Sequence, residues 1–454
     1  MMQLSQVAHA VGGQHLGADV ILRNISINTR DECLGRLFVA LKGENFDAHQ
    51  FVNQAEQAGA SALMVEQEVE TSLPIVLVKS THKALAELAA WWRSQFALPL
   101  IGVTGSVGKT TVKEMLACIF AEFGKGVVTK GNLNNEIGVP LTLMGLSDQD
   151  KYAIVEMGMN HAGEIERLSR MSKPTVALVN NAAAAHLEGL GTIEAVAKAK
   201  GEIYQGLSED GVAVINRDDE FSNMWLALSQ RYSVITFGLA EGADVTASYK
   251  ETKKGLVIKV NAKGQKLKIK LNTVGEHSVL NALAAVAVAI AAKVSVENIE
   301  MGLSKFEPVK GRLNIEAIAG VNVIDDTYNA NPASMRAAIN VLVQDENSVL
   351  IVGDMAELGA AAESEHKSLG KQAAARGVKK LYVCGEYAEL VAAEFGDGAR
   401  AFAEQDALIE QLKLDDLGGT ILVKGSRSAR MERVVEALHK QLAIQLSASS
   451  RGER

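Results

Sequence analysis

Short runs of apolar residues recur along the middle of the chain, each followed by a glycine-rich or polar turn and then by a helical pattern. Four such runs lie at residues 100–103, 152–155, 176–179 and 212–215. Apolar runs of this length that alternate with helical segments are typical of strands buried on both faces of a parallel sheet. The pattern therefore predicts a mostly parallel sheet with helical connections in this region.

The periodicity changes to two between residues 244 and 271. Residues 256–260 alternate apolar and polar side chains, residues 267–271 do the same, and Gly264 lies between the two runs. A sheet with one apolar and one polar face is typical of antiparallel strands, and the glycine indicates a tight turn. We expect an antiparallel hairpin appended to the parallel sheet.

Two further α/β units flank this region. Before it, we expect strands at 37–41, 61–65 and 75–78 and helices at 51–58 and 82–96. Pro99 follows the second helix and marks a boundary, because the residue before a proline avoids the helical conformation. After Arg312, we expect strands at 321–324, 349–352, 381–383 and 421–423, with helical segments between them.

The length of 454 residues corresponds to about three domains. We predict an α/β protein with a small mixed N-terminal domain over residues 1–85. A central domain over residues 98–311 carries the mostly parallel sheet and the hairpin. A C-terminal Rossmann-like α/β domain covers residues 312–454.

Composition and charge exclude several classes of protein. The net charge of −8 argues against a general nucleic-acid-binding surface. The three cysteines, Cys33, Cys118 and Cys384, lack the spacing of metal ligands, and we expect buried free thiols. Residues 1–13 show no export signal, and the most apolar stretch, residues 282–292, is too short to span a bilayer. These features predict a cytoplasmic protein without membrane insertion and without a nucleic-acid partner.

The strongest chemical signal follows the run at 100–103 and precedes a helical pattern at 112–123. Glycines in such a loop turn backbone N–H groups towards phosphates, and the helix N-terminus adds positive potential. The lysine would reach the β/γ-phosphates and the next hydroxyl would bind Mg²⁺. The usual first glycine of this motif is replaced by Val103, with Gly102 one place early. The predicted phosphate loop consists of Thr104, Gly105, Ser106, Val107, Gly108, Lys109, Thr110 and Thr111.

Three further side chains could act beside this loop, and each also has an ordinary interpretation. Glu156 ends the strand at 152–155 and is either a Mg²⁺ ligand or a solvated carboxylate. His186 follows the strand at 176–179 and is either a metal ligand or a surface histidine. Lys200 lies in a helical segment, where a solvated lysine is the ordinary case. A metal would repel its ammonium, so a role at the metal requires a change of its charge.

Two polar segments of the C-terminal unit are candidate ligand contacts. Residues 325–332 follow the strand at 321–324, and ligands bind at the carboxyl ends of parallel strands in α/β proteins. Their asparagines and proline also fit a simple turn. Arg312 follows Gly311 at the junction of the second and third domains, where it is either a hinge residue that reaches a phosphate or a surface arginine.

Taken together, the longer strings resemble the Mur ligases, the ATP-dependent amide-forming enzymes of peptidoglycan precursor synthesis. The resemblance covers nearly the whole chain and includes Val103, which agrees with the family's form of the phosphate loop. It is closest to the branch that joins D-alanyl-D-alanine to UDP-N-acetylmuramoyl-tripeptide. The strings that carry the resemblance are residues 132–140, 185–189, 325–332, 353–359 and 424–428.

The resemblance implies a role for each candidate residue. ATP would contact the phosphate loop, Asn281, Arg312 and Asp326. Mg²⁺, at two sites, would be held by Thr110, Glu156, His186 and Lys200, with Lys200 carbamylated so that its charge becomes negative. Lys109, Glu156, His186 and Lys200 would be catalytic. Thr29, Arg30 and Lys42 would contact the UDP part of the substrate, and Asn134, Asn135 and Glu136 its peptide. The resemblance also implies a monomer.

Three alternatives stay open beside this ligase. A sister ligase that adds another amino acid would share the phosphate loop, but residues 132–140 and 325–332 argue against it. An NTP-driven switch would hydrolyse nucleotide without an acceptor. A GTPase would need an Asn-Lys-x-Asp or Thr-Lys-x-Asp motif, which the sequence lacks. A pure binding module would leave Lys109, Glu156 and His186 without a shared purpose.

Overall fold

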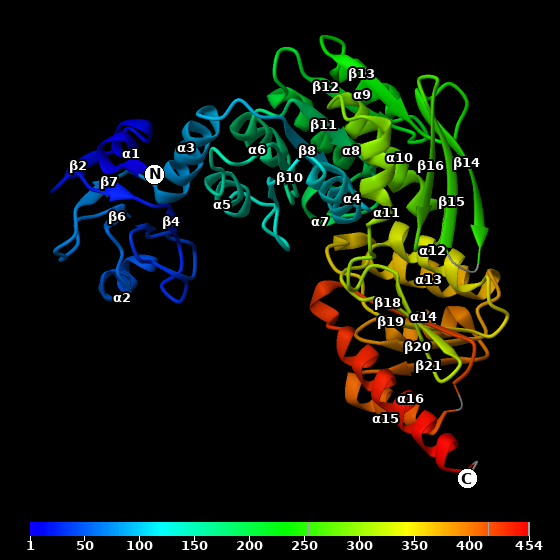
Figure 1. Ribbon diagram of the computed structural model, residues 1–454. Helices are drawn as coiled ribbons and strands as arrows, with labels where there is room; N and C mark the ends of the chain where they lie inside the picture. The colour runs from blue at the N-terminus through cyan, green and yellow to red at the C-terminus, as the bar shows by residue number, and fades with distance from the viewer. Residues whose placement is uncertain (253–254, 416, 453–454) are drawn as a thin grey trace.

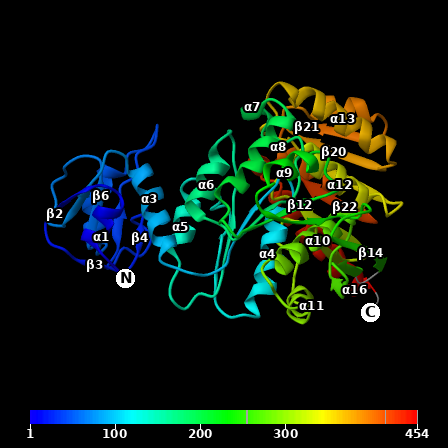
Figure 2. The ribbon, with the colours of Figure 1, turned by 90° about the horizontal axis from the view of Figure 1, so that it is seen from above.

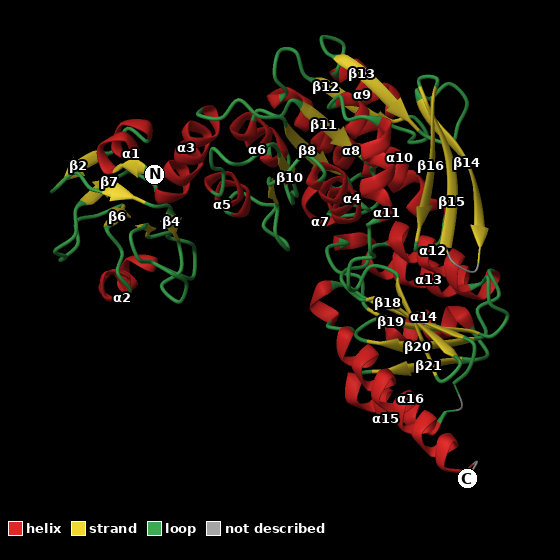
Figure 3. Ribbon diagram, in the orientation of Figure 1, coloured by secondary structure: helices red, strands yellow, loops and turns green. Residues whose placement is uncertain are grey.

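The computed structural model describes residues 1–252, 255–415 and 417–452, and three large β-sheets organise them in chain order (Figures 1 and 3). The first sheet lies in the N-terminal unit and has five strands in the order β2-β7-β6-β5-β4, of which β2 is antiparallel to β7. A separate two-stranded sheet joins β1 and β3. The elements are β1 (Met2–Gln3), α1 (Leu4–Ala10), β2 (Gln14–Leu16), β3 (Ile21–Leu22), β4 (Ile25–Ser26), β5 (Leu37–Val39), α2 (Val52–Gln57), β6 (Ala62–Val65), β7 (Ile75–Leu77) and α3 (Thr81–Ser94).

Helix α3 leaves the N-terminal unit and lies against two helices of the central unit, α5 (Gly138–Met144) and α6 (Glu164–Ser172) (Figure 2). Trp92 Nε1 donates to the carbonyl of Leu146 at 3.1 Å, and Arg93 Nε donates to the carbonyl of Ser172 at 3.0 Å. These contacts fix the helix to the central unit, while the strands of the N-terminal unit lie to one side (Figure 2).

The central sheet has nine strands in the order β16-β15-β14-β13-β12-β11-β8-β10-β9. Strands β8 to β14 are parallel to one another, as the apolar runs predict. Strands β15 and β16 form the predicted antiparallel hairpin, and β14 pairs antiparallel with β15. The remaining elements are β8 (Leu100–Thr104), α4 (Lys109–Ala121), β9 (Val127–Val128), β10 (Ala153–Glu156), β11 (Val176–Val179), α7 (Leu187–Leu190), α8 (Ile193–Gly201), β12 (Val212–Asn216), α9 (Ser222–Leu228), β13 (Ser233–Phe237), β14 (Val245–Thr252), β15 (Gly255–Ala262), β16 (Gln265–Leu271), α10 (Glu276–Ala291) and α11 (Val296–Ser304).

Strand β8 lies between β11 and β10 and is buried along its whole length. Its alternate residues enter two different cores, because side chains of a strand point to opposite faces. Ile101 and Val103 pack with α4 and α10 on one face, and Leu100 packs on the other face with α5, α6 and α8. The loop that follows β8 is therefore held from both sides of the sheet.

The third sheet has six strands in the order β17-β18-β22-β19-β20-β21, all parallel except β17. Helices α12, α13 and α14 cover one face, and α15 and α16 cover the other, which is the Rossmann-like arrangement that the sequence predicts. The elements are β17 (Asn314–Ile318), β18 (Val321–Asp326), α12 (Pro332–Leu342), β19 (Ser348–Gly353), α13 (Ala362–Ala375), β20 (Lys380–Cys384), α14 (Ala388–Phe395), β21 (Ala399–Phe402), α15 (Gln405–Leu414), β22 (Thr420–Lys424) and α16 (Glu432–Gly452).

Two sequence predictions about the whole chain can be compared with this structure. The three cysteines are free thiols; Cys33 and Cys384 are buried as expected, whereas Cys118 is only partly buried. Within the described ranges, no helix combines the length and the apolar character that crossing a membrane requires.

Candidate active site

The phosphate loop connects β8 to α4, as the sequence predicts, and α4 begins at Lys109. Gly108 has a φ of 81°, and a Cβ built on it would lie 2.3 Å from Asn281 Oδ1. A side chain at this position is therefore excluded both by its backbone conformation and by the approach of α10. The close approach places Asn281, a predicted adenine-nucleotide contact, directly against the loop.

Lys109 Nζ folds back over the loop and donates to the carbonyl of Gly105 at 2.5 Å. Burial lowers the pKa of this amine, and the nearby carboxylate of Glu156 opposes the shift. The ammonium lies among backbone atoms that a phosphate would contact. A bound anion would therefore stabilise the charge of Lys109, which burial otherwise destabilises.

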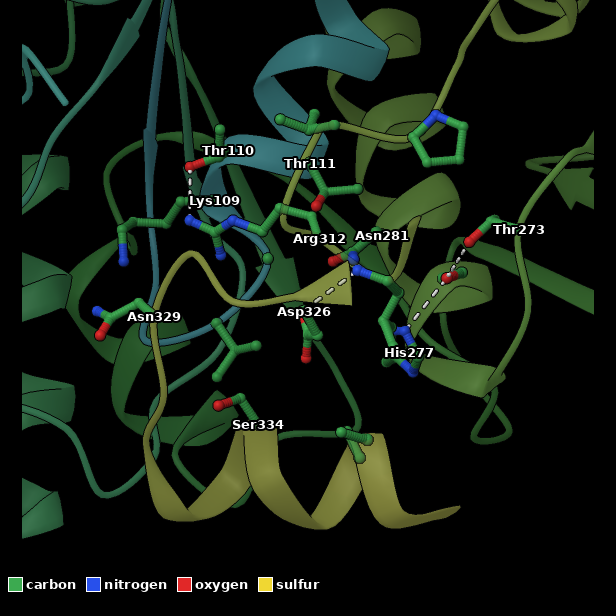
Figure 4. Close-up of a pocket in the computed structure, with 18 of the residues that line it drawn as sticks. Lys109, Thr110, Thr111, Thr273, His277, Asn281, Arg312, Asp326, Asn329 and Ser334 are labelled. Carbon is green, nitrogen blue, oxygen red and sulfur yellow. Dashed lines mark hydrogen bonds between the residues drawn. The ribbon is translucent and has the colours of Figure 1, made fainter. Parts of the chain in front are cut away.

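The phosphate loop forms one wall of a cavity between the central unit and the C-terminal unit (Figure 4). Helix α12 lies across the opposite side, with Ser334 facing the cavity (Figure 4). Besides the loop, the predicted nucleotide contacts that line it are Asn281, Arg312 and Asp326.

Arg312 and Asp326 are held in this cavity by neighbours from different elements. Arg312 Nη2 donates to Thr110 Oγ1 at 3.3 Å, and its guanidinium lies 4.1 Å from the centre of the Tyr328 ring. Asp326, at the end of β18, pairs through Oδ2 with Lys424 Nζ at 2.5 Å. Burial lowers the pKa of Lys424, and Asp326 opposes the shift. The ends of β18 and β22, which lie nearest the phosphate loop, therefore carry a buried ion pair.

A second cavity adjoins the first, and Glu156 and Glu357 are among the residues that line it. It is lined by the loop at 131–135, by the end of β10, by the loop around His186 and by residues 356–357 of the C-terminal unit. The residues that line both cavities are Ser106, Lys109, Arg312, Asn329, Ala330 and Asn331. The two cavities thus meet at the phosphate loop.

Glu156 is the last residue of β10, where parallel pairing places it opposite Val103. Its Oε1 accepts from Asn134 Nδ2 at 2.8 Å, and its backbone N–H donates to Thr129 Oγ1 at 3.0 Å. Its Oε2 is buried without a hydrogen-bond partner among the described residues. A buried carboxylate oxygen in this state fits a bound cation, because an unpaired buried charge is costly.

His186 lies directly before α7 and has a left-handed φ of 57°. Its Nδ1 lies 2.7 Å from Glu357 Oε2, which belongs to the C-terminal unit. The hydrogen bond to His186 lowers the pKa of Glu357, and burial opposes this shift. Sequence reasoning gave Glu357 no role, although the residue lies in the string 353–359. That string was the only signal in the sequence, and it did not indicate that Glu357 contacts His186.

Lys200 lies in the last turn of α8 and is 1% exposed. Burial lowers its pKa well below the usual value, and the charge of Lys109 lowers it further. Burial thus favours the uncharged form of this amine. No three His, Cys, Asp or Glu side chains in the described part of the chain are grouped so that they could hold a metal, and the predicted set accordingly depends on Thr110 and Lys200 as well.

The predicted substrate contacts lie in two places. Asn134 binds Glu156, Asn135 Oδ1 accepts from the N–H of Gly138 at 2.9 Å at the start of α5, and Glu136 pairs with Arg167. Asn134 and Asn135 line the second cavity. Thr29, Arg30 and Lys42 lie in the N-terminal unit and line neither cavity. Thr29 Oγ1 lies 3.4 Å from Gln54 Oε1, and Lys42 Nζ lies 3.8 Å from Asp47 Oδ2.

This arrangement is that of a nucleotide-dependent ligase built from three consecutive units. Protein-family models match each unit in turn: "Mur ligase family, catalytic domain" over residues 21–93, "Mur ligase middle domain" over 103–289 and "Mur ligase, glutamate ligase domain" over 311–427. The chain belongs to the Mur ligase family.

Individual relatives narrow the comparison to one branch of this family. The UDP-N-acetylmuramoyl-tripeptide–D-alanyl-D-alanine ligase of Escherichia coli (strain K12) is 43% identical over 444 residues, which are 96% of this chain and 98% of that protein. The crystal structure of MurF from Acinetobacter baumannii matches with a TM-score of 0.91 and 35% identity over 96% of this chain and 98% of that chain. The MurF ligase from Thermotoga maritima in complex with ADP matches with a TM-score of 0.84 and 29% identity over 94% and 100%.

Proposed function

We propose that the chain is an ATP-dependent ligase that joins D-alanyl-D-alanine to UDP-N-acetylmuramoyl-tripeptide and so forms the UDP-MurNAc-pentapeptide precursor of peptidoglycan. The observation that carries this proposal is the shared wall of the two cavities, formed around Lys109 and Arg312. A phosphoryl donor in the first cavity would lie next to a carboxylate in the second, and holding two reactants in this way accelerates their reaction. The Escherichia coli relative supports the choice of substrates.

The nucleotide would bind in the cavity of Figure 4, and the ADP complex of the Thermotoga maritima relative supports an adenine nucleotide. Backbone N–H groups of the phosphate loop and the start of α4 favour the negative charge of the phosphates. Lys109 Nζ would turn from the Gly105 carbonyl to the β/γ-phosphates. Asn281, Arg312 and Asp326 would contact the nucleotide from α10 and from the C-terminal unit.

The reaction proceeds in two steps. A carboxylate oxygen of the UDP-linked peptide attacks the γ-phosphorus, the bond to ADP breaks, and an acyl phosphate forms. The neutral amine of D-alanyl-D-alanine then attacks the acyl carbon, phosphate leaves with the bonding electron pair, and the extra proton of the nitrogen passes to the departing phosphate. The first step converts a poor leaving group into a good one, and the enclosure between the units keeps water from the acyl phosphate.

Thr110, Glu156 and His186 would hold Mg²⁺, which when bound offsets the repulsion between the substrate carboxylate and the phosphates. The partnerless Oε2 of Glu156 supports this placement. We further propose that Lys200 is carbamylated: burial lowers the pKa of its amine, and an unprotonated amine adds CO₂ with release of one proton to solvent. The resulting anion would serve a second Mg²⁺ site.

The UDP moiety would contact Thr29, Arg30 and Lys42 in a domain over residues 1–85, and the peptide would contact Asn134, Asn135 and Glu136. The nucleotide domain would extend over residues 98–311 and the closing domain over residues 312–454. The enzyme would act as a monomer in the cytoplasm, where its nucleotide-linked substrate and ATP are available.

The test is phosphate release from ATP and Mg²⁺ with UDP-MurNAc-tripeptide, measured with and without D-alanyl-D-alanine. We expect release that requires both substrates and a pentapeptide product confirmed by mass. Release without either substrate would instead identify a nucleotide switch. Release with a different amino acid alone would identify a sister ligase.

A further inference from the structure

The string at 353–359 has no role in the reaction described above, yet it brings a strained residue to the active site. Glu357 has a φ of 62°, in the left-handed region that side chains other than glycine rarely adopt. Strained backbone of this kind persists only where the surrounding structure enforces it, and it gathers at functional positions. The question is what holds Glu357 in this conformation and what its side chain does there.

The C-terminal unit holds the segment on both sides of Glu357. The Asp354 carboxylate accepts from the backbone N–H groups of Glu386, at 2.8 Å, and Tyr387, at 3.3 Å, just before α14. The Met355 N–H donates to Nε2 of the buried His366 at 3.0 Å. Leu358 is 2% exposed in the core of this unit. The segment is thus a fixed part of the C-terminal unit, and Glu357 is its projecting side chain.

Across the boundary, Glu357 meets the central unit at the candidate metal ligand. Its Oε2 lies 2.7 Å from His186 Nδ1, and its backbone carbonyl accepts from the Glu188 N–H at 3.3 Å. Gly359 packs against Glu188, since a Cβ at Gly359 would lie 3.1 Å from the Glu188 Cα. A half-exposed ion pair alone contributes little stability. It is therefore a weak reason for keeping the strained backbone.

We propose that Glu357 is a positioning residue that orients His186 for the metal and makes this ligand depend on docking of the C-terminal unit. A carboxylate that accepts from one imidazole nitrogen fixes the ring and the tautomer, and leaves the other nitrogen as the electron-pair donor. Here Nδ1 is the ring nitrogen that faces the Glu357 carboxylate, at 2.7 Å, and Nε2 is the nitrogen left for Mg²⁺. Because the carboxylate and the imidazole belong to different units, the ligand is oriented only when the two units meet. This inference rests on the proposed function.

The first experiment measures metal binding rather than turnover. Mn²⁺ binding in the presence of ADP is followed by electron paramagnetic resonance for wild type, Glu357→Ala and Glu357→Gln. We expect Glu357→Ala to weaken Mn²⁺ binding about tenfold or more. Glu357→Gln keeps an acceptor oxygen and should restore part of the loss. Glu363→Ala, which removes an exposed carboxylate paired with Lys367 beyond the segment, is the control and should bind Mn²⁺ as wild type does.

A second measurement separates positioning from a direct role with the amine. Acyl phosphate formed without D-alanyl-D-alanine is trapped by borohydride reduction and measured by mass. We expect Glu357→Ala to lower the yield of acyl phosphate together with Mn²⁺ affinity, at an unchanged melting temperature. Normal Mn²⁺ affinity and normal acyl phosphate with slower amide formation would overturn the inference in favour of a base for the amine. Pentapeptide synthesis by wild type is run in parallel, so that its absence would reject the proposed function instead.

Discussion

At the scale of single residues, Lys200 shows how burial prepares a side chain for chemistry. Its pKa lies well below the usual value because the amine is desolvated beside Lys109. Between the lowered pKa of the folded protein and a pH of about 10.4, the unfolded chain binds a proton at this position that the folded protein does not bind, so the residue costs stability. The lowered pKa of Lys200 is therefore obtained at the expense of folding stability.

Lys200→Met should therefore raise the free energy of unfolding in buffers freed of CO₂. The gain should be absent above a pH of about 10.4 and should grow as the pH falls from there to the pKa of the folded protein. Urea unfolding at pH 9 and at pH 7 measures the difference between the variant and wild type. A gain that is the same at both pH values would contradict a pKa of Lys200 far below its usual value.

The activity of variants at this position should change in the opposite direction. Lys200→Ala should lower turnover by about two orders of magnitude, because the carbamate proposed at this position would be lost from the metal site. Short-chain carboxylic acids should restore part of the turnover by placing a carboxylate in the vacated space. Full activity of the variant without such acids would remove the carbamate role.

The buried pair of Asp326 and Lys424 carries a second prediction. Both side chains are nearly inaccessible, at 9% and 3% exposure, and Asp326 Oδ1 also accepts from the Leu313 N–H at 3.2 Å. Asp326→Ala should lower the free energy of unfolding by about 3–5 kcal/mol, because it leaves the Lys424 amine buried without its partner. The same variant should raise the KM for ATP more than the KM for the UDP substrate.

The matched control for this pair is the double variant Asp326→Ala with Lys424→Met. It should recover part of the lost stability, because no unpaired charge remains, while ATP use stays impaired. Chemical denaturation and steady-state kinetics measure the two effects separately. An unchanged KM for ATP in the single variant would remove Asp326 from the nucleotide site.

Sequence reasoning selected candidate residues that follow strands, and it did not select Glu357, whose contact with His186 depends on two units meeting. Lys109, Glu156 and Asp326 each lie at or just beyond the end of a strand, and the apolar runs place those ends. Glu357 touches His186 although 171 positions separate them, and no local pattern reports such a contact. The assignments of Thr29, Arg30 and Lys42 stay predictions, since the structure places them away from both cavities.

At the scale of elements, a buried lysine ties the phosphate-loop helix to the strand that ends in Glu156. Lys113 lies one turn after Lys109 on α4, is 1% exposed and donates through Nζ to the Thr129 carbonyl at 2.8 Å. The Thr129 hydroxyl in turn accepts from the Glu156 N–H at 3.0 Å. These contacts hold the start of the loop at 130–137, which carries Asn134 to the Glu156 carboxylate.

Lys113→Met should loosen this connection, because the Thr129 carbonyl loses its buried donor. We expect kcat to fall about tenfold, as for other residues that orient metal ligands, with a smaller change in the KM for ATP. Amide hydrogen exchange should become faster in residues 129–137. Glu114→Gln removes the ion pair with Lys113 but keeps the bond to Thr129, and should leave both readouts unchanged. Unaltered exchange in Lys113→Met would show that the loop is held by other contacts.

The elements that sequence reasoning missed share a physical cause. The central strands β8, β10, β11 and β12 are buried on both faces, so their sequences are continuous apolar runs that identify them to within one or two residues. Strand β17 lies at a sheet edge and is largely exposed, and β9 has only two residues. Such strands form because a neighbouring strand offers hydrogen bonds, and an apolar pattern cannot report that.

At the scale of the whole molecule, the two cavities exist only because the central and C-terminal units face each other (Figures 1 and 4). The connection between them runs through Gly311 and Leu313, which have φ values of 74° and 51° and flank Arg312. The backbone at this junction therefore takes an unusual path that aims Arg312 at Thr110. The path of the connection is thus part of the active site.

Gly311→Ala should disturb the arrangement of the units without unfolding either of them. A Cβ at Gly311 would lie 3.2 Å from the Tyr328 nitrogen, and alanine disfavours this positive φ. We expect kcat to fall about tenfold as the Arg312 contact is displaced, since small misplacements of reacting groups are costly. The radius of gyration from small-angle scattering should respond less to ADP and Mg²⁺ than in wild type.

Gly320→Ala is the matched control, because Gly320 has a similar φ of 82° with open space around its Cβ position, in the turn between β17 and β18. Equal kinetic losses in the two variants would show that only folding stability was affected; a loss confined to Gly311→Ala would show that the junction sets the geometry of the reaction.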